Sequence, residues 1–357
     1  MTDLLCFMKR EFYKRLLILS IWMAVLVFPL WACQSGSVVM EPNPEILENV
    51  PPGLSVHEIA ALSSLEQIDD FPLYTMVYEG DLIQEGDTAA QQNYSNDPAW
   101  ACSLFAAYGD LDEILYGRNF DWDFSPALLL FMYPPEGYAS VSMVDIHYLG
   151  FGGERAFDIT DLPLEEQVGF LDAPYLPFDG MNEAGLVVGM AAVPPGHMEQ
   201  DPDKETIGSL MAIRKILDQA ATIEESVEII QNFNIDMGST PIHYLIAERS
   251  GRSALIEFSQ GEILVLLNEE PWQMATNFLM SETSTSQDIS CGRYRRIEER
   301  LTDIEGKISP DQAMALLDDV AQPSTQWSVV YRVSAGEVWV AMGGKYNQVH
   351  KIDNGFD

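Results

Sequence analysis

One cysteine, Cys102, stands where a nucleophile could be created by cutting the chain. It follows a polar, turn-forming stretch, residues 86–99, of the kind in which proteolytic cuts are tolerated. Cleavage before Cys102 would leave a free α-amine beside the thiol, and this amine could take the thiol proton while the sulfur attacks a carbonyl carbon. Because a free α-amine has a pKa of about 8, it is a suitable base at neutral pH, and no histidine is required.

Charged and amide side chains follow Cys102 in an ordered series of short motifs. The series comprises Arg118 and Asp121 in Gly-Arg-Asn-Phe-Asp-Trp, Asn182 in Gly-Met-Asn-Glu-Ala-Gly, Asn277 in Thr-Asn-Phe, and Arg293 in Gly-Arg-Tyr. Each motif alone has an ordinary explanation, such as a surface ion pair, a turn asparagine or the start of a charged helix. No His, Cys and carboxylate cluster has the spacing of metal ligands, so no metal or cofactor is predicted.

From Cys102 onward, the series resembles the family of choloylglycine hydrolases, penicillin V acylases and acid ceramidase-like amidases. These are N-terminal-nucleophile enzymes, and the resemblance implies that Cys102 is the nucleophile and that the chain is cut before it. It also implies a role for each further residue of the series: Arg118 beside the thiol, Asp121 as acceptor for the α-amine, Asn277 by its side chain and Asn182 by its backbone as donors to the oxyanion, and Arg293 as support for this polar cluster.

The resemblance implies hydrolysis of a linear amide, an N-acyl amine or N-acyl amino acid, through a Cys102 thioester. After Leu186 the chain reads Val-Val-Gly-Met-Ala-Ala-Val-Pro-Pro, where bile-salt and penicillin enzymes more often have an Asn-Phe-Pro-like ending. This departure disfavours a specific bile-salt or penicillin substrate. Three alternatives stay open: an acyltransferase on the same scaffold, a non-catalytic surface lipoprotein, and a Cys–His peptidase that depends on His243. The expected partner is a small-molecule amide with an acyl chain, and homo-oligomer formation stays open.

The first 33 residues have the pattern of an export signal. Four basic residues within the first 15 positions precede an almost unbroken apolar run, residues 16–31, which ends at Leu30-Trp31-Ala32-Cys33. This ending resembles a bacterial lipoprotein cleavage site with Cys33 as the lipidated residue; simple secretion and an uncleaved anchor are the alternatives. We therefore expect an exported protein, either a cell-envelope lipoprotein held at the membrane by a lipid anchor or a secreted protein.

Composition restricts the class of protein further. The formal net charge is −36, from 19 Lys and Arg against 55 Asp and Glu, which argues against a nucleic-acid partner because phosphate binding needs a basic surface. Hydrophobic residues make up 47% and charged residues 21%, which predicts a globular core. With Cys6 in the signal and Cys33 assigned to lipid, only Cys102 and Cys291 remain, so no disulfide framework is expected.

The chain divides into three predicted parts: residues 1–33 as export signal, 34–101 as tether and propeptide, and 102–357 as catalytic domain. Apolar or alternating runs predict strands at 103–108, 113–122, 127–132, 139–146, 185–193, 243–247, 253–258, 263–267, 327–333 and 337–342. Helices are predicted at 206–220, 223–233 and 293–304, and another begins after Ser309 with a serine cap and Pro310 in its first turn. This mixture favours an α+β protein in which helix layers cover sheets, and the resemblance implies the four-layer αββα sandwich.

Overall fold

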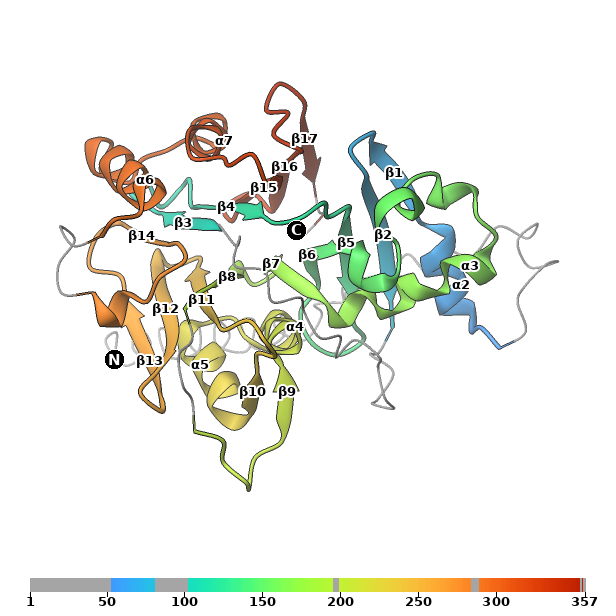
Figure 1. Cartoon of the computed structure of the whole chain (residues 1–357), viewed down its shortest axis with the longest axis horizontal. Coiled ribbons are helices and arrows are strands. Elements are labelled where there is room, and N and C mark those ends of the chain that lie inside the picture. The colour runs from blue at the N-terminus through green and yellow to red at the C-terminus, as the bar shows by residue number, and fades with distance from the viewer. Residues whose placement is uncertain (1–52, 81–101, 195–198, 284–288, 354, 356–357) are drawn as a thin grey trace, which may run out of the picture. The chain divides into compact units, whose positions relative to one another are not determined.

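The computed structural model describes residues 53–80, 102–194, 199–283, 289–353 and 355, all within one compact unit (Figure 1). The export signal, Cys33 and the stretch 86–99 lie outside these residues, so the predictions made for them remain predictions. Among the helices in the described ranges, none is both long and apolar enough to cross a membrane.

Nine strands form the larger sheet, in the order β1-β2-β5-β6-β7-β8-β11-β12-β13. Neighbouring strands are antiparallel except β2 and β5, which run parallel. The strands are β1 (Glu66–Asp69), β2 (Leu73–Glu79), β5 (Ala127–Tyr133), β6 (Ser140–Asp145), β7 (Pro177–Asn182), β8 (Leu186–Ala192), β11 (Ile242–Glu248), β12 (Arg252–Ser259) and β13 (Glu262–Leu267).

Six antiparallel strands form the smaller sheet, in the order β14-β3-β4-β15-β16-β17. These strands are β3 (Ser103–Ala107), β4 (Leu115–Asp121), β14 (Trp272–Ala275), β15 (Thr325–Arg332), β16 (Glu337–Met342) and β17 (Val349–Asp353). Two short parallel strands, β9 (Thr206–Gly208) and β10 (Asn234–Asp236), pair apart from both sheets.

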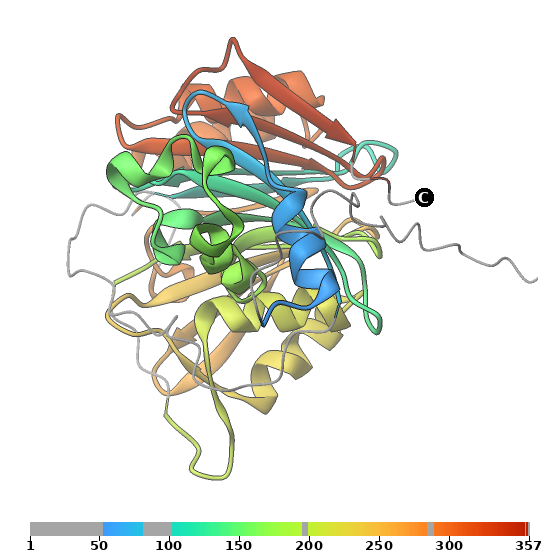
Figure 2. The ribbon, with the colours of Figure 1, turned by 90° about the vertical axis from the view of Figure 1, so that its right-hand side faces the viewer.

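Helices cover the outer faces of the two stacked sheets. α4 (Ser209–Gln219) and α5 (Ile223–Asn232) pack on β7, β8, β11 and β12, whereas α6 (Gly292–Asp303) and α7 (Pro310–Asp319) pack on β3, β4, β14 and β15. α2 (Val56–Ser63) lies against β2, and α3 (Leu164–Gln167) and short 3-10 helices connect β6 to β7. The layers follow one another as helix, sheet, sheet, helix (Figures 1 and 2), which confirms the predicted αββα sandwich.

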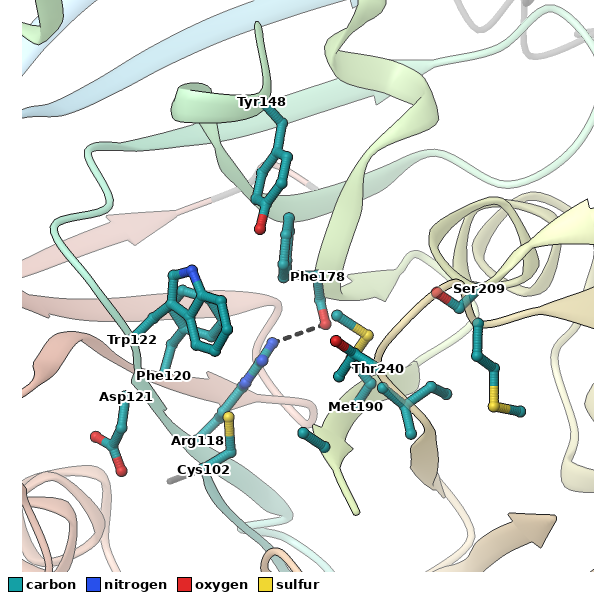
Figure 3. Close-up of a pocket in the computed structure, with 13 residues that line it drawn as sticks. Cys102, Arg118, Phe120, Asp121, Trp122, Tyr148, Phe178, Met190, Ser209 and Thr240 are labelled. Atoms are coloured by element: carbon teal, nitrogen blue, oxygen red, sulfur yellow. Dashed lines mark hydrogen bonds between the residues drawn. The ribbon is translucent and has the colours of Figure 1, made fainter. Parts of the chain in front are cut away.

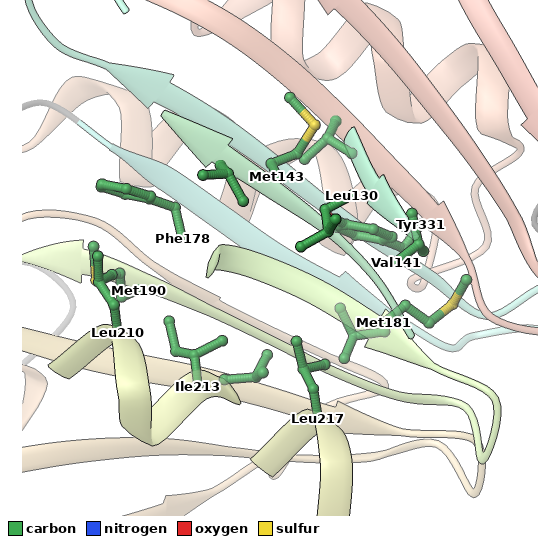
Figure 4. Close-up of a cluster of buried hydrophobic side chains, with 14 of the residues drawn as sticks. Leu130, Val141, Met143, Phe178, Met181, Met190, Leu210, Ile213, Leu217 and Tyr331 are labelled. Carbon is green, nitrogen blue, oxygen red and sulfur yellow. The ribbon is translucent and has the colours of Figure 1, made fainter. Parts of the chain in front are cut away.

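The apolar face of α4 shows how the pattern of the sequence sets this packing. Leu210, Ile213 and Leu217 lie one helical turn apart and are buried against the larger sheet (Figure 4). The helix begins at Ser209, three residues later than predicted, because Thr206–Gly208 form a strand with β10. Between the sheets, side chains such as Met143 and Tyr331 fill the interior.

The segment before Cys102 is part of this fold. β2 pairs with β5 along seven residues, so the predicted propeptide contributes strands to the larger sheet. The Tyr74 hydroxyl donates to the carbonyl of Ala156 at 2.8 Å, and His350 of β17 lies 2.6 Å from the carboxylate of Asp69. Residues 53–80 are therefore a folded segment that contacts both sheets.

Candidate active site

Cys102 directly precedes β3 and lies at the end of the space between the two sheets. Its side chain is 3% exposed and borders a small cavity of about 20 Å³ (Figure 3). Such a volume holds about one water molecule. The cavity is lined by Cys102, Arg118, Phe120, Asp121, Trp122, Tyr148, Phe178, Met190, Ala192, Ser209, Met237, Thr240 and Ile242.

Arg118 lies beside the thiol, as predicted. It projects from β4 and is fully buried, and its positive charge acts on the Cys102 thiol. Burial raises the pKa of the Cys102 thiol, while the positive charge of Arg118 and a hydrogen bond from the backbone of Asp121 oppose that rise. The site therefore offsets part of the free-energy cost of removing the thiolate from water.

Asp179 is the counter-charge of Arg118, and it was not predicted. It projects from β7 on the facing sheet, is fully buried, and forms an ion pair with Arg118. The Tyr331 hydroxyl donates to its other carboxylate oxygen. Burial raises the pKa of Asp179, and the charge of Arg118 opposes that rise. The only signal in the sequence was an acidic residue inside the apolar run Pro177-Phe178-Asp179, a position that is costly unless it is paired.

Asp121 lies at the end of β4, and its two carboxylate oxygens differ in their hydrogen bonding. The hydroxyl of Thr325 donates to Oδ1, whereas Oδ2 is buried without a hydrogen-bond partner among the described residues. Burial raises the pKa of Asp121 to about 6, so the group is ionised at neutral pH. An unpaired buried carboxylate oxygen beside Cys102 is suited to accept a hydrogen bond from an amine created there.

Arg293 joins the remaining predicted residues to the nucleophile. From the first turn of α6, its guanidinium donates to the carbonyl of Cys102, to Ser103 Oγ at 2.8 Å and to Asn277 Oδ1 at 2.9 Å. The amide of Asn277 in turn donates to the carbonyl of Ala192 at 2.8 Å. Arg293 and Asn277 thus lie at the site by direct contact, as the sequence predicted.

Asn182 does not lie at this site, which corrects the prediction for this residue. It ends β7 at the turn of the β7–β8 hairpin, and its side chain donates to the carbonyls of Leu217 and Ala220 at 3.0 and 2.7 Å. Phe178, on the same strand, lines the cavity, and four residues of extended strand separate the two by roughly 13 Å. Asn182 was chosen by its distance along the chain from Cys102, but the hairpin brings Ala192 to the cavity instead.

Aromatic side chains form one wall of the cavity, and the sequence reasoning did not identify them. Phe120 and Trp122 flank Asp121 on the chain, and Tyr148 packs on Phe178 with ring centroids 5.6 Å apart. Phe120 also stacks on the buried ring of Trp327, with centroids 4.0 Å apart. The alternation along β4 into Trp122 gives only a weak signal, because such a run is equally typical of a core strand.

His243 lies apart from the cavity. It is fully buried on β11, with Nδ1 3.5 Å from Glu257 Oε1, and it is not among the lining residues. Within the described part of the chain, no group of three His, Cys, Asp or Glu side chains is placed to hold a metal ion. The thiol, the carboxylate and the amide donors are the groups with which this arrangement can act on a carbonyl carbon.

Comparison with known proteins gives one family match. The model of the family described as acyl-coenzyme A:6-aminopenicillanic acid acyl-transferase matches residues 177–343, from the start of β7 to just beyond β16. No curated protein matches the sequence.

Solved structures with a similar fold include penicillin V acylase from Agrobacterium tumefaciens, with a TM-score of 0.47, 17% identity, and coverage of 71% of this chain and 91% of that chain. Two variants of conjugated bile acid hydrolase from Clostridium perfringens have TM-scores of 0.49 and 0.48 and identities of 17% and 16%; each alignment covers 71% of this chain and 92% of the other.

The matched residues include Asp179, Asn277 and Arg293, and the fold brings these together with Cys102 and Arg118 from the preceding strands. With its αββα fold and this ordered site, the chain resembles the choloylglycine hydrolase and penicillin V acylase family, and the acyl-transferase family model matches slightly less than half of it.

Proposed function

We propose that this protein hydrolyses the C–N bond of a linear amide, an N-acyl amine or N-acyl amino acid, with Cys102 as nucleophile after cleavage of the chain before it. The observation that carries the proposal is the buried thiol placed between the guanidinium of Arg118 and the carboxylate of Asp121, whose Oδ2 lacks a partner among the described residues. A core cysteine with a purely structural role would need neither group.

Cleavage would supply the base. The new α-amine of Cys102 would donate a hydrogen bond to Asp121 Oδ2 and take the thiol proton as Sγ attacks the carbonyl carbon of the amide. Collapse of the tetrahedral intermediate breaks the C–N bond, and the same proton goes to the leaving amine. Water then attacks the Cys102 thioester, releases the carboxylic acid and regenerates the thiol.

The oxyanion that forms during both attacks needs hydrogen-bond donors. The Asn277 amide is the candidate donor, because Arg293 holds its carbonyl oxygen and its NH₂ group points to Ala192, which lines the cavity. A preorganised donor of this kind stabilises the transition state more than the ground state. Arg293 also donates to the carbonyl of Cys102, so it holds the nucleophile and the Asn277 amide in fixed positions relative to each other.

The substrate carries an acyl group that packs on the aromatic wall formed by Phe120, Trp122, Tyr148 and Phe178. A cavity of about 20 Å³ is too small for such a group, so side chains must move before it binds. Met190 and Met237 are suited to that movement, because the unbranched thioether side chain adapts its shape readily. The small size of this cavity is consistent with a precursor that gains activity on cleavage.

Anchoring of the enzyme depends on the segment before the cut. Lipidation of Cys33 would hold residues 53–80 at the membrane, and the seven-residue pairing of β2 with β5 would hold the catalytic part to that segment. We expect an exported protein that stays at the cell envelope after processing.

An acyltransferase is the second candidate, because the matching family model is described by an acyl-transfer reaction. Product analysis with and without an acceptor amine separates the two: transfer gives a new amide, and hydrolysis gives only the free acid. A Cys–His peptidase is disfavoured by the position of His243, which lies outside the cavity lining next to Glu257.

Intact mass and N-terminal sequencing of the purified wild type, Cys102→Ala and Cys291→Ala proteins test the proposal. We expect a fragment that begins at Cys102 in the wild type and in Cys291→Ala, and an uncut Cys102→Ala chain. Cys291 is the matched control, because it is the other free cysteine in the described ranges and does not line the cavity. Amide hydrolysis should follow the same pattern. Processed wild-type protein that hydrolyses no N-acyl amide would refute the proposal.

A further inference from the structure

A fully buried acid, Glu257, lies outside the cavity lining and takes no part in the chemistry proposed above. It projects from β12, and its carboxylate lies 3.5 Å from the imidazole of His243 on β11. Burial raises the pKa of this carboxyl, but His243 and the backbone amides of residues 280 and 281 hold the pKa below its usual value, so the group is ionised at neutral pH. A buried charge is costly unless it is bonded, so the partners of Glu257 indicate its role.

The two carboxylate oxygens of Glu257 accept from consecutive backbone amides. Oε1 accepts from the N–H of Met280 at 2.7 Å, and Oε2 accepts from the N–H of Ser281 at 2.9 Å. A hydrogen bond to an ionised acceptor is about twice as strong as a neutral one. The two bonds therefore tie the start of the short 3-10 helix η6 (Met280–Glu282) firmly to the larger sheet.

This attachment point follows the candidate oxyanion donor closely along the chain. β14 belongs to the smaller sheet and ends at Ala275, so the chain passes from one sheet to the other before it reaches Met280. Residues 276–279 form this passage and belong to no helix or strand, and Asn277 is one of them. Arg293 holds the side chain of Asn277, whereas Glu257 holds the backbone three residues further on.

We propose that Glu257 is a positioning residue, which fixes the backbone after Asn277 and so holds the Asn277 amide where the oxyanion forms. This inference rests on the proposed amidase function and on Asn277 as its donor. A donor stabilises the transition state only if it is already in place when charge develops. A displacement of about 1 Å that begins far from the reacting atoms can lower a rate by about a hundredfold.

Glu257→Gln tests this role, because glutamine keeps the size of the side chain and one acceptor oxygen, while its NH₂ group cannot accept from the second amide. Absorbance of nitroaniline measures hydrolysis of decanoyl p-nitroanilide, and intact mass counts the processed chains. We expect kcat per processed chain to fall by about tenfold to a hundredfold, with KM changed by less than about twofold. In an Asn277→Ala background the same substitution should lower kcat by less than about twofold, because the group that Glu257 positions is gone.

Glu248→Gln is the matched control. Glu248 is also a buried glutamate of the larger sheet, and its Oε2 accepts from the N–H of Ile223 at 2.8 Å. It lies at the opposite end of β11 from Ile242, which lines the cavity. Urea unfolding should show a loss of stability in both glutamine variants, whereas Glu248→Gln should keep the wild-type kcat.

Ser259→Ala gives a milder test of the same attachment. The Ser259 hydroxyl, also on β12, donates to the carboxylate of Glu282 at 2.8 Å, at the other end of η6. Its loss should lower kcat by a few-fold when Asn277 is present and leave kcat unchanged in the Asn277→Ala background. This variant decides the question if Glu257→Gln does not fold.

A wild-type kcat in folded Glu257→Gln, an equal loss with and without Asn277, or a matching loss in Glu248→Gln would overturn this inference and leave the amidase proposal standing. A processed wild-type protein that hydrolyses neither decanoyl p-nitroanilide nor N-decanoylglycine would overturn both.

Discussion

Replacing Asp145 by asparagine should stabilise the protein at alkaline pH relative to acidic pH. Asp145 ends β6 and is 1% exposed; its Oδ1 accepts the backbone N–H of His147 at 2.9 Å, and its Oδ2 has no partner among the described residues. Burial raises the pKa of this carboxyl from 3.8 to about 7. The folded protein therefore keeps a proton that the unfolded chain has already lost, and folding stability falls as pH rises toward 7.

The size of this effect follows from the two pKa values. A shift of about 3 units at about 1.36 kcal/mol each places the total near 4 kcal/mol, and about 3 kcal/mol of it falls between pH 5 and 8.5. Asparagine has no proton to lose, and its Oδ1 can still accept from His147. Any cost of its buried NH₂ group applies equally at both pH values.

Urea unfolding at pH 5 and pH 8.5 measures this difference. Both proteins carry Cys102→Ala, so that each remains one uncut chain. The unfolding free energy of Asp145→Asn, relative to its parent, should increase by about 3 kcal/mol between the two pH values. A change below about 1 kcal/mol would mean that the carboxylate stays ionised in the folded protein, and the reasoning from burial would be wrong.

Three further predictions concern the site and its processing. Asn277→Ala should lower kcat of the processed enzyme by about 10²–10³-fold with a smaller change in KM, measured by steady-state amide hydrolysis; an unchanged kcat would exclude Asn277 as an oxyanion donor. Because burial raises the pKa of Asp121 to about 6, cleavage of purified precursor should slow as pH falls through 6, and Asp121→Asn should be cut slowly at every pH. Mass spectrometry measures this cleavage, and a wild-type rate that does not change from pH 5 to 7 would contradict the prediction. After cleavage, the fragment that carries residues 53–80 should elute with the catalytic part in size-exclusion chromatography, and elution as two separate species would show that the β2–β5 pairing is too weak.

Periodicity predicted most of the fold after Cys102, because these strands and helices carry a clear apolar pattern. The predicted strands at 103–108, 127–132, 253–258 and 337–342 agree closely with β3, β5, β12 and β16. Several strands were missed. β1, β9, β10 and β14 have three or four residues each, too few for a period to show, whereas β7 and β17 are longer, with six and five residues.

Residues of the site were predictable where a motif was local to the strand that carries them. Arg118 and Asp121 belong to one short motif on β4, which pairs directly with the strand that follows Cys102. Asp179 reaches Arg118 from the facing sheet, and no local pattern reports a contact across 61 positions of the chain. The prediction for Asn182 was wrong for a related reason. The number of residues between it and Cys102 does not determine at which end of a hairpin it lies.

The parallel pairing of β2 with β5 has a thermodynamic consequence once the chain is cut before Cys102. The two strands then belong to different polypeptides, so folding changes from a unimolecular to a bimolecular process and the measured stability depends on protein concentration. A precursor diluted out of denaturant can reassemble by itself, whereas the processed protein must first find its other half. The folded protein would therefore stay intact after the cut. Once unfolded, however, the cut protein would refold poorly at low concentration.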